Sequence, residues 1–297
     1  MDRWGRTQLN IICNFSNVFH LLIYSSVYLS FTGASMVYIS CTIQHIPCSL
    51  TLSAIMFLVT FSVYNINRKT DGNEDAINHP DRYSFTSRYG KILSNSAIFA
   101  YILAIVLALS CGIIAALISA IPLICGILYS IAWMPPGFRY KRLKEIPVVK
   151  NLVIAVSWAS TPAFLPVYSN DLDFNAATLM VFIFFFISAF INSVVFDMRD
   201  IKGDVASGVR TIPAIFGAKG TIKILTSLNL FFGLINLFLY PDYISSGFVY
   251  LFVAGMIYTN FCVLTFGKIK KANLFCDIAT DGKFIFFGSF IYIATRL

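Results

Sequence analysis

The sequence predicts an all-α, polytopic membrane protein, and two observations carry this prediction. First, the 297 residues are 58% hydrophobic and only 12% charged, whereas a soluble domain usually carries about a quarter charged residues. Second, apolar stretches of about 20 residues, the length that a helix needs to cross a bilayer, recur along the whole chain. A chain of this composition would expose a large apolar surface in water, so we expect it to be embedded in a membrane.

Nine stretches are long and apolar enough to be predicted as transmembrane helices. The first begins near Val18 and lacks a small-residue cleavage site, so we expect a retained span rather than a signal peptide. The third and fourth are separated only by Cys111 and Gly112, which predicts a tight hairpin. The ninth is short and rich in aromatic residues. The expected spans are residues 18–40, 48–66, 91–111, 113–133, 151–169, 174–196, 223–240, 246–266 and 283–296.

The distribution of Lys and Arg supports this number of spans and gives an orientation. If the N-terminus lies on the first side, then the tail and the loops after the second, fourth, sixth and eighth spans lie there too. These segments contain 21 of the 22 basic residues, and only Arg296 falls on the other side. The positive-inside rule assigns the basic side to the cytoplasm, so we expect a cytoplasmic N-terminus and, with it, a cytoplasmic active site.

Topology also explains the net charge of +8, so we expect no nucleic-acid partner. No organelle transit segment is recognisable, which favours a prokaryotic plasma membrane. The whole chain, 1–297, is expected to form one domain with a weak internal repeat. Residues 18–133 and 151–266 each contain four spans, with a ninth helix, 283–296, appended. Each half places an acid-rich segment after its second span, which predicts two acidic segments on the same side of the membrane.

The first acidic segment reads NRKTDGNEDAINHPDR, from Asn67 to Arg82, and follows the second span directly. Asn67, Asp71 and Asp75 are spaced by four residues, which places them on one face if the span continues as a helix. Gly72 weakens a helix at this point. The segment therefore predicts either an extended helix end or a loop, with three oxygen-bearing side chains in both cases.

The second acidic segment reads FDMRDIKGDVASGVRTIP, from Phe196 to Pro213, and follows the sixth span. Asp197, Asp200 and Asp204 follow helical spacing and form another stripe on one face. Acidic residues at helix ends can be simple caps, and basic loops can be simple topology signals. Two matching segments on equivalent helices instead favour a shared functional site.

Carboxylates that are stacked on one helix face repel one another, and a bound cation removes this repulsion. Oxygen ligands suit Mg²⁺, which usually binds one or two carboxylates together with phosphate oxygens of a substrate. We expect the catalytic residues to be Asp71, Asp75, Asp200 and Asp204. The expected Mg²⁺ ligands are Asn67, Asp71, Asp75, Asp197, Asp200 and Asp204. The side chains expected to hold a diphosphate are Asn67, Arg68, Arg82, Lys141, Lys144 and Arg210.

A diphosphate site at a membrane face predicts a substrate with a polar head and a lipid tail, such as a polyprenyl diphosphate. Mg²⁺ stabilises the charge that develops on the diphosphate when the allylic C–O bond breaks. Water would quench the remaining carbocation, so the reaction requires a dry chamber. The chain contains 29 Phe and 15 Tyr; most serve ordinary packing, and some can line such a chamber and stabilise the cation.

Both acidic segments resemble motifs of the UbiA superfamily of intramembrane prenyltransferases. NRKTDGNEDAINHPDR is similar to its first motif, Asn-xxx-Asp-xxx-Asp followed by AINxPxR, at Asn67, Asp71, Asp75, Asn78, Pro80 and Arg82. DMRDIKGDVASGVRTIPAIFG is similar to its second motif at Asp197, Asp200, Asp204, Gly208, Thr211, Pro213 and Gly217. Between the two motifs, the chain also resembles the family's central Tyr–Lys segment, at Tyr140, Lys141 and Lys144.

The resemblance implies nine helices bundled around a central cavity with a cytoplasmic cap. It also implies two Mg²⁺ ions between the acidic motifs and the prenyl diphosphate, with the prenyl tail in the cavity and an acceptor that attacks C1. The chain departs from the family pattern at two positions, where Arg68 replaces an Asp and Phe196 replaces an Asn. These departures leave the subfamily, and therefore the acceptor, open.

The main hypothesis is transfer of a polyprenyl group from its diphosphate to a lipophilic acceptor, and an aromatic acceptor of the quinone or phenazine type is favoured. The alternatives are a carotenoid or ether-lipid acceptor, or cyclisation of the prenyl chain. A membrane transporter is a distant alternative, because transporters place ionisable groups near the bilayer midplane and here they cluster at one face. The expected partners are the two substrates and membrane lipids, with no obligate protein partner.

Overall fold

The computed structural model describes residues 18–70, 72–137, 140–206, 209–239, 246–266, 268–269 and 272–294. Every regular element in these ranges is helical, so the predicted all-α class is confirmed. A short helical segment, Val18–Tyr24, comes first. The elements that follow are α2 (Val27–Ile43), α3 (Leu50–Thr70), α4 (Gly72–Asn78), α5 (Pro80–Ser110), α6 (Ile113–Ser130), η1 (Leu143–Glu145), α7 (Val149–Tyr168), α8 (Ala176–Ala206), α9 (Ile212–Leu239), α10 (Ser246–Phe266), α11 (Ala272–Phe275), the π-helical η2 (Cys276–Thr280) and α12 (Lys283–Ala294).

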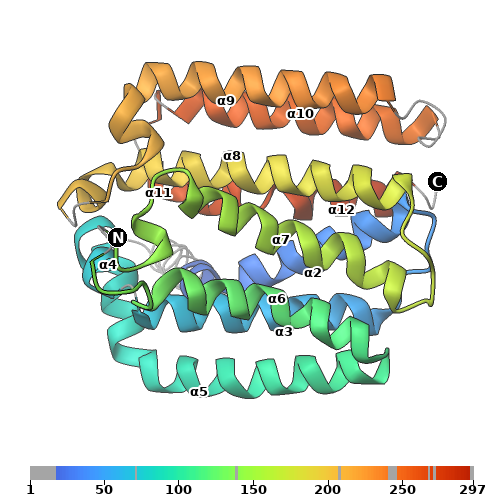
Figure 1. The fold of residues 1–297 in the computed structure, drawn as a ribbon, viewed down its shortest axis with the longest axis horizontal. Helices are drawn as coiled ribbons and strands as arrows, with labels where there is room; N and C mark the ends of the chain where they lie inside the picture. The colour runs from blue at the N-terminus through green and yellow to red at the C-terminus, as the bar shows by residue number, and fades with distance from the viewer. Residues whose placement is uncertain are drawn as a thin grey trace, which may run out of the picture.

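The long helices lie side by side along one common direction (Figure 1). α9 and α10 pack against each other, and α9 packs on α8 at one edge of the bundle. α5 lies at the opposite edge, where it packs on α3 and α6. Between these edges, packed pairs lead from α12 through α2, α3, α6 and α7 to α8. The short helices α4 and α11 lie at the same end of the bundle, on the left in Figure 1.

Six of the described helices, α3, α5, α6, α7, α8 and α9, are long and apolar enough to cross a membrane. Val18–Tyr24 and α2 together form a seventh candidate span, although they meet at an angle of 62°. α10 has 21 residues, and its segment Phe252–Phe266 is an apolar helix, while α12 has 12 residues. The chain is an integral membrane protein, while the nine spans, the internal repeat and the cytoplasmic orientation stay predictions.

Helices extend beyond the apolar stretches at the end that carries the acidic segments. α8 continues to Ala206, so Asp197, Asp200 and Asp204 lie on the same helix as the sixth predicted span, as expected. α5 begins at Pro80 instead of residue 91, because proline is well suited to the first turn of a helix and hydropathy does not detect polar turns. Asp71 lies outside the described residues, so its place in the predicted stripe stays a prediction.

The sequence of α5 explains how an edge helix packs in a membrane. Its large apolar side chains, including Ile92, Phe99 and Ile102, are exposed, as expected of a surface that faces lipid. Small residues at helical spacing let a neighbouring backbone approach closely. The buried residues of α5 are all small, namely Ser94, Ala97, Ala100, Ala104 and Ala108.

A close approach of α2 and α3 fixes one side of the bundle. Gly33 on α2 lies so near Thr60 on α3 that a Cβ atom at residue 33 would overlap the Thr60 hydroxyl. Both residues line the same cavity. Glycine at this position therefore sets the width of the cavity between the two helices.

Candidate active site

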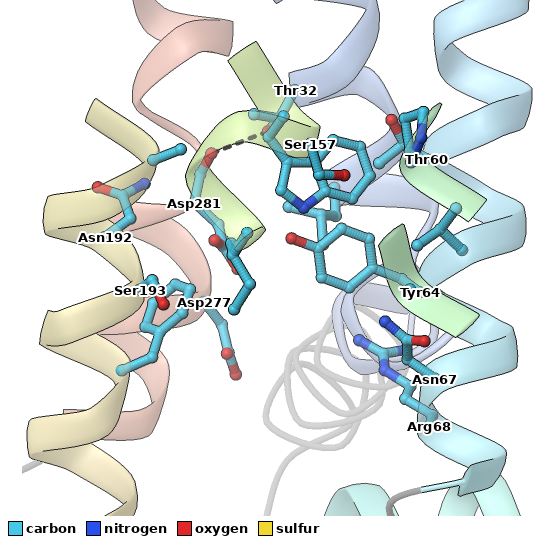
Figure 2. A pocket seen from close by; sticks show the side chains of 18 of the residues that line it. Thr32, Thr60, Tyr64, Asn67, Arg68, Ser157, Asn192, Ser193, Asp277 and Asp281 are labelled. Atoms are coloured by element: carbon cyan, nitrogen blue, oxygen red, sulfur yellow. Dashed lines mark hydrogen bonds between the residues drawn. The ribbon is translucent and has the colours of Figure 1, made fainter. Parts of the chain in front are cut away.

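A cavity of about 310 Å³ lies between α2, α3, α6, α7, α8 and α12. Met36, Pro122 and Phe284 contribute to its apolar lining, whereas charged side chains of α3, α4, α5, α8 and η2 contribute to its polar lining. In Figure 2, labelled residues of α3 project from one wall, and Asn192 and Ser193 of α8 lie on the facing wall. Because charged groups inside a membrane bundle are costly, this cavity is the candidate site.

Six carboxylates line the cavity against four cationic side chains, which leaves two formal negative charges. The carboxylates belong to Asp75, Asp197, Asp200, Asp204, Asp277 and Asp281, and the cations belong to Arg68, Arg82, Lys150 and Arg199. A lining of this sign repels an anionic diphosphate unless cations accompany it. The charge balance therefore fits an anion that binds together with divalent cations.

The first acidic segment contributes Asp75, which is buried on α4. Its Oδ1 accepts a hydrogen bond of 2.6 Å from Nη2 of Arg82, which lies in the first turn of α5. Its Oδ2 is also buried and has no hydrogen-bond partner among the described residues. A buried carboxylate oxygen without a partner is costly, and a bound Mg²⁺ ion would satisfy it.

The end of α4 is attached directly to α8. Oδ1 of Asn78 accepts a hydrogen bond of 3.1 Å from the backbone N–H of Gly203. A Cβ atom at residue 203 would overlap the Asn78 amide, so this contact requires glycine. One residue further, Nε2 of His79 lies 3.1 Å from Oδ1 of Asp200. The structure thus brings the two acidic segments together into one site.

Burial lowers the pKa of His79 below its ordinary value, and this effect outweighs the hydrogen bond to Asp200. The imidazole is therefore neutral at pH 7. A neutral imidazole whose Nε2 carries the proton donates a hydrogen bond to the Asp200 carboxylate without cancelling its charge. The charge of the Asp200 carboxylate is therefore balanced by Arg199 and not by His79.

Lys150 connects two acids of α8. Its Nζ lies 2.8 Å from Oδ1 of Asp197 and 3.5 Å from Oδ2 of Asp204. Oδ2 of Asp197 also accepts a hydrogen bond of 2.9 Å from the Asn151 amide. Lys150 and Asn151 lie in the first turn of α7, so α7 holds this part of the second acidic segment.

Arg199 neutralises the middle acid of the stripe. Its guanidinium makes two hydrogen bonds of 2.8 Å to the Asp200 carboxylate, and its Nη1 also lies 3.2 Å from Oδ1 of Asp277 on η2. The side chain is almost completely buried. Arg199 therefore links α8 to the chain that leads into α12.

Arg68 points into the cavity rather than to the membrane surface. Its guanidinium donates hydrogen bonds to the carbonyl oxygens of Tyr24 and Ile23. These carbonyls end the segment Val18–Tyr24, just before the bend into α2, where helical carbonyls lack partners within their own helix. Arg68 therefore provides hydrogen-bond donors for the carbonyl groups at the bend, and it places a positive charge beside the acids.

Most of the predicted site residues meet in this cavity. Its lining contains Asn67, Arg68, Asp75, Arg82, Asp197, Asp200 and Asp204. Lys141 and Arg210 are exposed, and Lys144 is buried in η1; none of these three contributes to the described lining. Their contact with phosphate stays a prediction, as do all the assigned roles in catalysis and metal binding.

Sequence reasoning missed several polar residues of the site. Lys150 directly precedes the predicted span 151–169 and Arg199 lies inside the second motif, so the sequence alone indicates only a topology signal for both. Asp277 and Asp281 follow the eighth predicted span in CDIATDGK, another pair of acids one helical turn apart. The four-residue spacing of these two acids could have identified them as site residues. They lie after residue 266, however, and so outside the two predicted repeats.

The donor set fits Mg²⁺, because the acids of both segments offer only oxygen atoms and the buried Oδ2 of Asp75 has no partner in the described part of the chain. Among the described residues, no three Asp, Glu, His or Cys side chains converge closely enough to enclose an ion. Asp200 and Asp204 instead contact Arg199 and Lys150. Phosphate oxygens from a substrate would complete such an incomplete ligand set.

Comparison with known proteins places the same features in one family. The sequence profile of the UbiA prenyltransferase family matches residues 27–277, a range that contains both acidic segments. A digeranylgeranylglyceryl phosphate synthase from Natronomonas pharaonis is 29% identical over 185 residues, which cover 60% of this chain and 61% of the relative. The chain therefore matches this relative over less than two thirds of its length.

Solved structures share the fold over almost the whole chain. The apo structure of a UbiA homologue from Aeropyrum pernix K1 has a TM-score of 0.67 at 14% identity and covers 91% of this chain and 98% of its own. A UbiA homologue from Archaeoglobus fulgidus, bound to DMAPP and Mg²⁺, has a TM-score of 0.65 at 15% identity, with coverages of 90% and 96%. At such low identity, the likeness concerns the fold alone.

Proposed function

Because the chain belongs to the UbiA prenyltransferase family, we propose that it transfers a polyprenyl group from its diphosphate to a hydroxyl group of a lipophilic acceptor, with Mg²⁺ as cofactor. One observation carries the proposal: a single cavity is lined both by charged side chains, six of them carboxylates, and by apolar and aromatic side chains. A substrate with an anionic head and a lipid tail matches this distribution.

The diphosphate is assigned to the end where α4 meets α8. Asp75, Asp200 and Asp204 would hold Mg²⁺ there, supported by Asn67, Asp71 and Asp197. The bound ions would neutralise the charge that develops on the departing diphosphate. Lys150, Arg82 and Arg199 already contact these acids, so their cationic groups lie within reach of phosphate oxygens at the same place.

The prenyl tail is assigned to the apolar part of the cavity. Tyr64 and Trp158 both line it, and their rings stack with centroids 5.2 Å apart. Aromatic faces attract a positive charge, so this pair is suited to stabilise the allylic cation at C1. Enclosure by the membrane helices keeps water away from that cation.

For the acceptor, we favour a glycerol phosphate lipid over the aromatic ring that the sequence favoured. The N. pharaonis relative is named as a digeranylgeranylglyceryl phosphate synthase, and a product of that kind requires attack by a hydroxyl oxygen. An aromatic acceptor is the second candidate, because the Tyr64–Trp158 pair offers a surface on which a ring can stack. We also propose that the site faces the cytoplasm of a prokaryotic cell, as the distribution of basic residues predicts.

The test uses the purified protein in detergent with geranylgeranyl diphosphate, Mg²⁺ and either geranylgeranylglyceryl phosphate or a panel of aromatic acceptors. Products are followed by mass spectrometry and diphosphate release by a coupled assay. We expect a doubly prenylated glyceryl phosphate that forms only with Mg²⁺ and disappears with EDTA. Prenylation of a ring alone would favour the second candidate, and a cyclic hydrocarbon formed without acceptor would contradict both.

A matched pair of variants links the reaction to the site. Asp200→Asn removes one charge from the polar end, whereas Asp171→Asn makes the same change on the distant connection between α7 and α8. Asp171 has a positive φ of 52°, a conformation that Asn adopts readily. We expect Asp171→Asn to behave as the wild type and Asp200→Asn to lose turnover.

A further inference from the structure

Two carboxylates in the cavity have no role in the proposed diphosphate site. Asp277 and Asp281 lie one helical turn apart, on η2 and on the turn that follows it. Asp277 forms an ion pair of 3.2 Å with Arg199. The carboxylate of Asp281 lines the cavity without a hydrogen bond or ion pair to any side chain in the described part of the chain.

The backbone around Asp281 is attached to α2 by two hydrogen bonds. Oγ1 of Thr32 donates a hydrogen bond of 3.0 Å to the carbonyl oxygen of Asp281, and the Tyr28 hydroxyl donates one of 3.0 Å to the carbonyl of Ile278. A Cβ atom at Gly282 would overlap the Tyr28 hydroxyl. These contacts fix the position of Asp281, although its own carboxylate stabilises nothing in the described structure.

Figure 2 shows Asp281 and Tyr64 on opposite sides of the pocket, with Asp281 lying between Thr32 and Asp277. Tyr64 is one of the two rings assigned above to the allylic cation. A small polar group that enters between these walls therefore meets an unpaired carboxylate on one side and the prenyl C1 on the other.

We propose that Asp281 is a catalytic residue, namely the base that removes the proton from the acceptor hydroxyl as its oxygen attacks C1 of the prenyl group. This inference rests on the proposed function. The bond between C1 and the diphosphate oxygen breaks, and its electron pair leaves with the diphosphate. The bond between the acceptor oxygen and C1 forms, and the hydroxyl proton moves to the Asp281 carboxylate, which later releases it to water.

The environment of Asp281 suits this role. Burial raises the pKa of Asp281 to about 7, and the nearby charge of Asp277 acts in the same direction. A general base is most effective when its pKa lies near the working pH. The charged or titratable groups that face it from the surrounding elements are Tyr28, Tyr64, Arg68, Arg82, Arg199, Cys276, Asp277 and Lys283.

The decisive variant is Asp281→Asn, which keeps the size of the side chain but cannot accept the proton. Transfer to geranylgeranylglyceryl phosphate should fall by about 10²–10⁴-fold in kcat, while the Kd for geranylgeranyl diphosphate with Mg²⁺ stays within about threefold of the wild type. Size-exclusion profiles and melting temperatures in detergent check that the variant is folded, and Asp171→Asn controls for the loss of one carboxylate elsewhere.

A pH profile gives a second readout. The kcat of the wild type should rise with pH through about 7, because a protonated Asp281 cannot act as a base, and Asp281→Asn should lack this rise. If Asp281→Asn does not fold, the wild-type profile decides, and a flat profile between about pH 5.5 and 8.5 overturns the proposal.

The outcomes separate the inference from the proposed function. If the wild type forms the ether product and Asp281→Asn forms it equally fast, the inference fails and the proposed function stands. If Asp281→Asn loses binding of the donor as well as transfer, Asp281 belongs to the diphosphate site and the inference is overturned. If the wild type prenylates no hydroxyl acceptor, both fail.

Discussion

The two acidic segments are held in different ways. The second lies on one long helix, α8, where Lys150 and Arg199 neutralise its three acids from within the bundle. The first lies on α3 and the short helix α4, and Asp75 is held only by Arg82 among the described side chains. The end of α4 then attaches to α8 through Asn78 and His79.

This difference assigns separate roles to the two halves. α8 is a fixed support, because its acids are paired and the helix packs on α7 and α9 along its length. α4 is a smaller element that depends on α8 for its position. Changes on α8 should therefore affect both stability and catalysis, whereas changes at the contact between α4 and α8 should affect catalysis more.

The largest effect is expected from Asp200→Asn. Asp200 contacts Arg199 and His79 and is a predicted Mg²⁺ ligand, so its loss affects the support, the α4 attachment and the proposed metal site together. Activity should fall at least about 100-fold. Product formation at saturating Mg²⁺ measures this effect, and near-normal turnover would show that the second segment is not part of the active site.

Lys150→Met tests the support itself. It leaves Asp197 and Asp204 buried without their cation, and breaking a buried ion pair in this way costs about 3–5 kcal/mol of stability. Thermal unfolding in detergent measures the loss. Mg²⁺ should raise the melting temperature of this variant more than that of the wild type, because two unpaired carboxylates bind the ion better.

The matched control is Lys202→Met, which removes an exposed cation from the same helix. We expect its unfolding to resemble that of the wild type, since an exposed charge contributes little. Equal melting temperatures for the two variants would contradict the role given to Lys150.

Gly203→Ala tests the attachment of α4 to α8. The new Cβ atom displaces the Asn78 amide, and we expect a cost of about 1–3 kcal/mol, as is usual for overpacking, with a larger loss of activity than of stability. Gly90→Ala on α5 is the control, because a Cβ atom there meets nothing within 4 Å. Unchanged turnover in Gly203→Ala would show that the contact is dispensable.

The smallest effect is expected from Arg82→Lys. The charge beside Asp75 is kept, but the planar guanidinium that makes the 2.6 Å contact is lost. We expect the KM for the prenyl diphosphate to rise by about tenfold, or about 1.4 kcal/mol, with a smaller change in kcat. A change in kcat alone would place Arg82 in the chemical step instead.

The sequence predicted the helical class, the position of most helices and the three-acid stripe on α8, because these follow from local hydropathy and helical spacing. It did not predict where α5 begins, since the turns from Pro80 onward are polar, although they are helical. The sequence predicted either an extension of the preceding helix or a loop at α4 and not a separate short helix, because Gly72 weakens helix formation.

The residues that contact the acids could also not be predicted from the sequence. Lys150 and Arg199 are separated by 49 positions in the chain, and only the packing of α7 on α8 brings both to the stripe. Asp281 depends on a contact with Thr32, which is 249 positions away. Such pairs arise from tertiary packing, which the spacing of residues within one segment does not contain.

The measurement that tests the central claim most directly is a double-mutant cycle between Asp75 on α4 and Asp200 on α8. The Kd for geranylgeranyl diphosphate with Mg²⁺ is measured by calorimetry for the wild type, Asp75→Asn, Asp200→Asn and the double variant. If the two segments form one site, the losses are coupled and the double variant binds little worse than either single variant. Losses in binding free energy that simply add would show two independent sites and contradict the account.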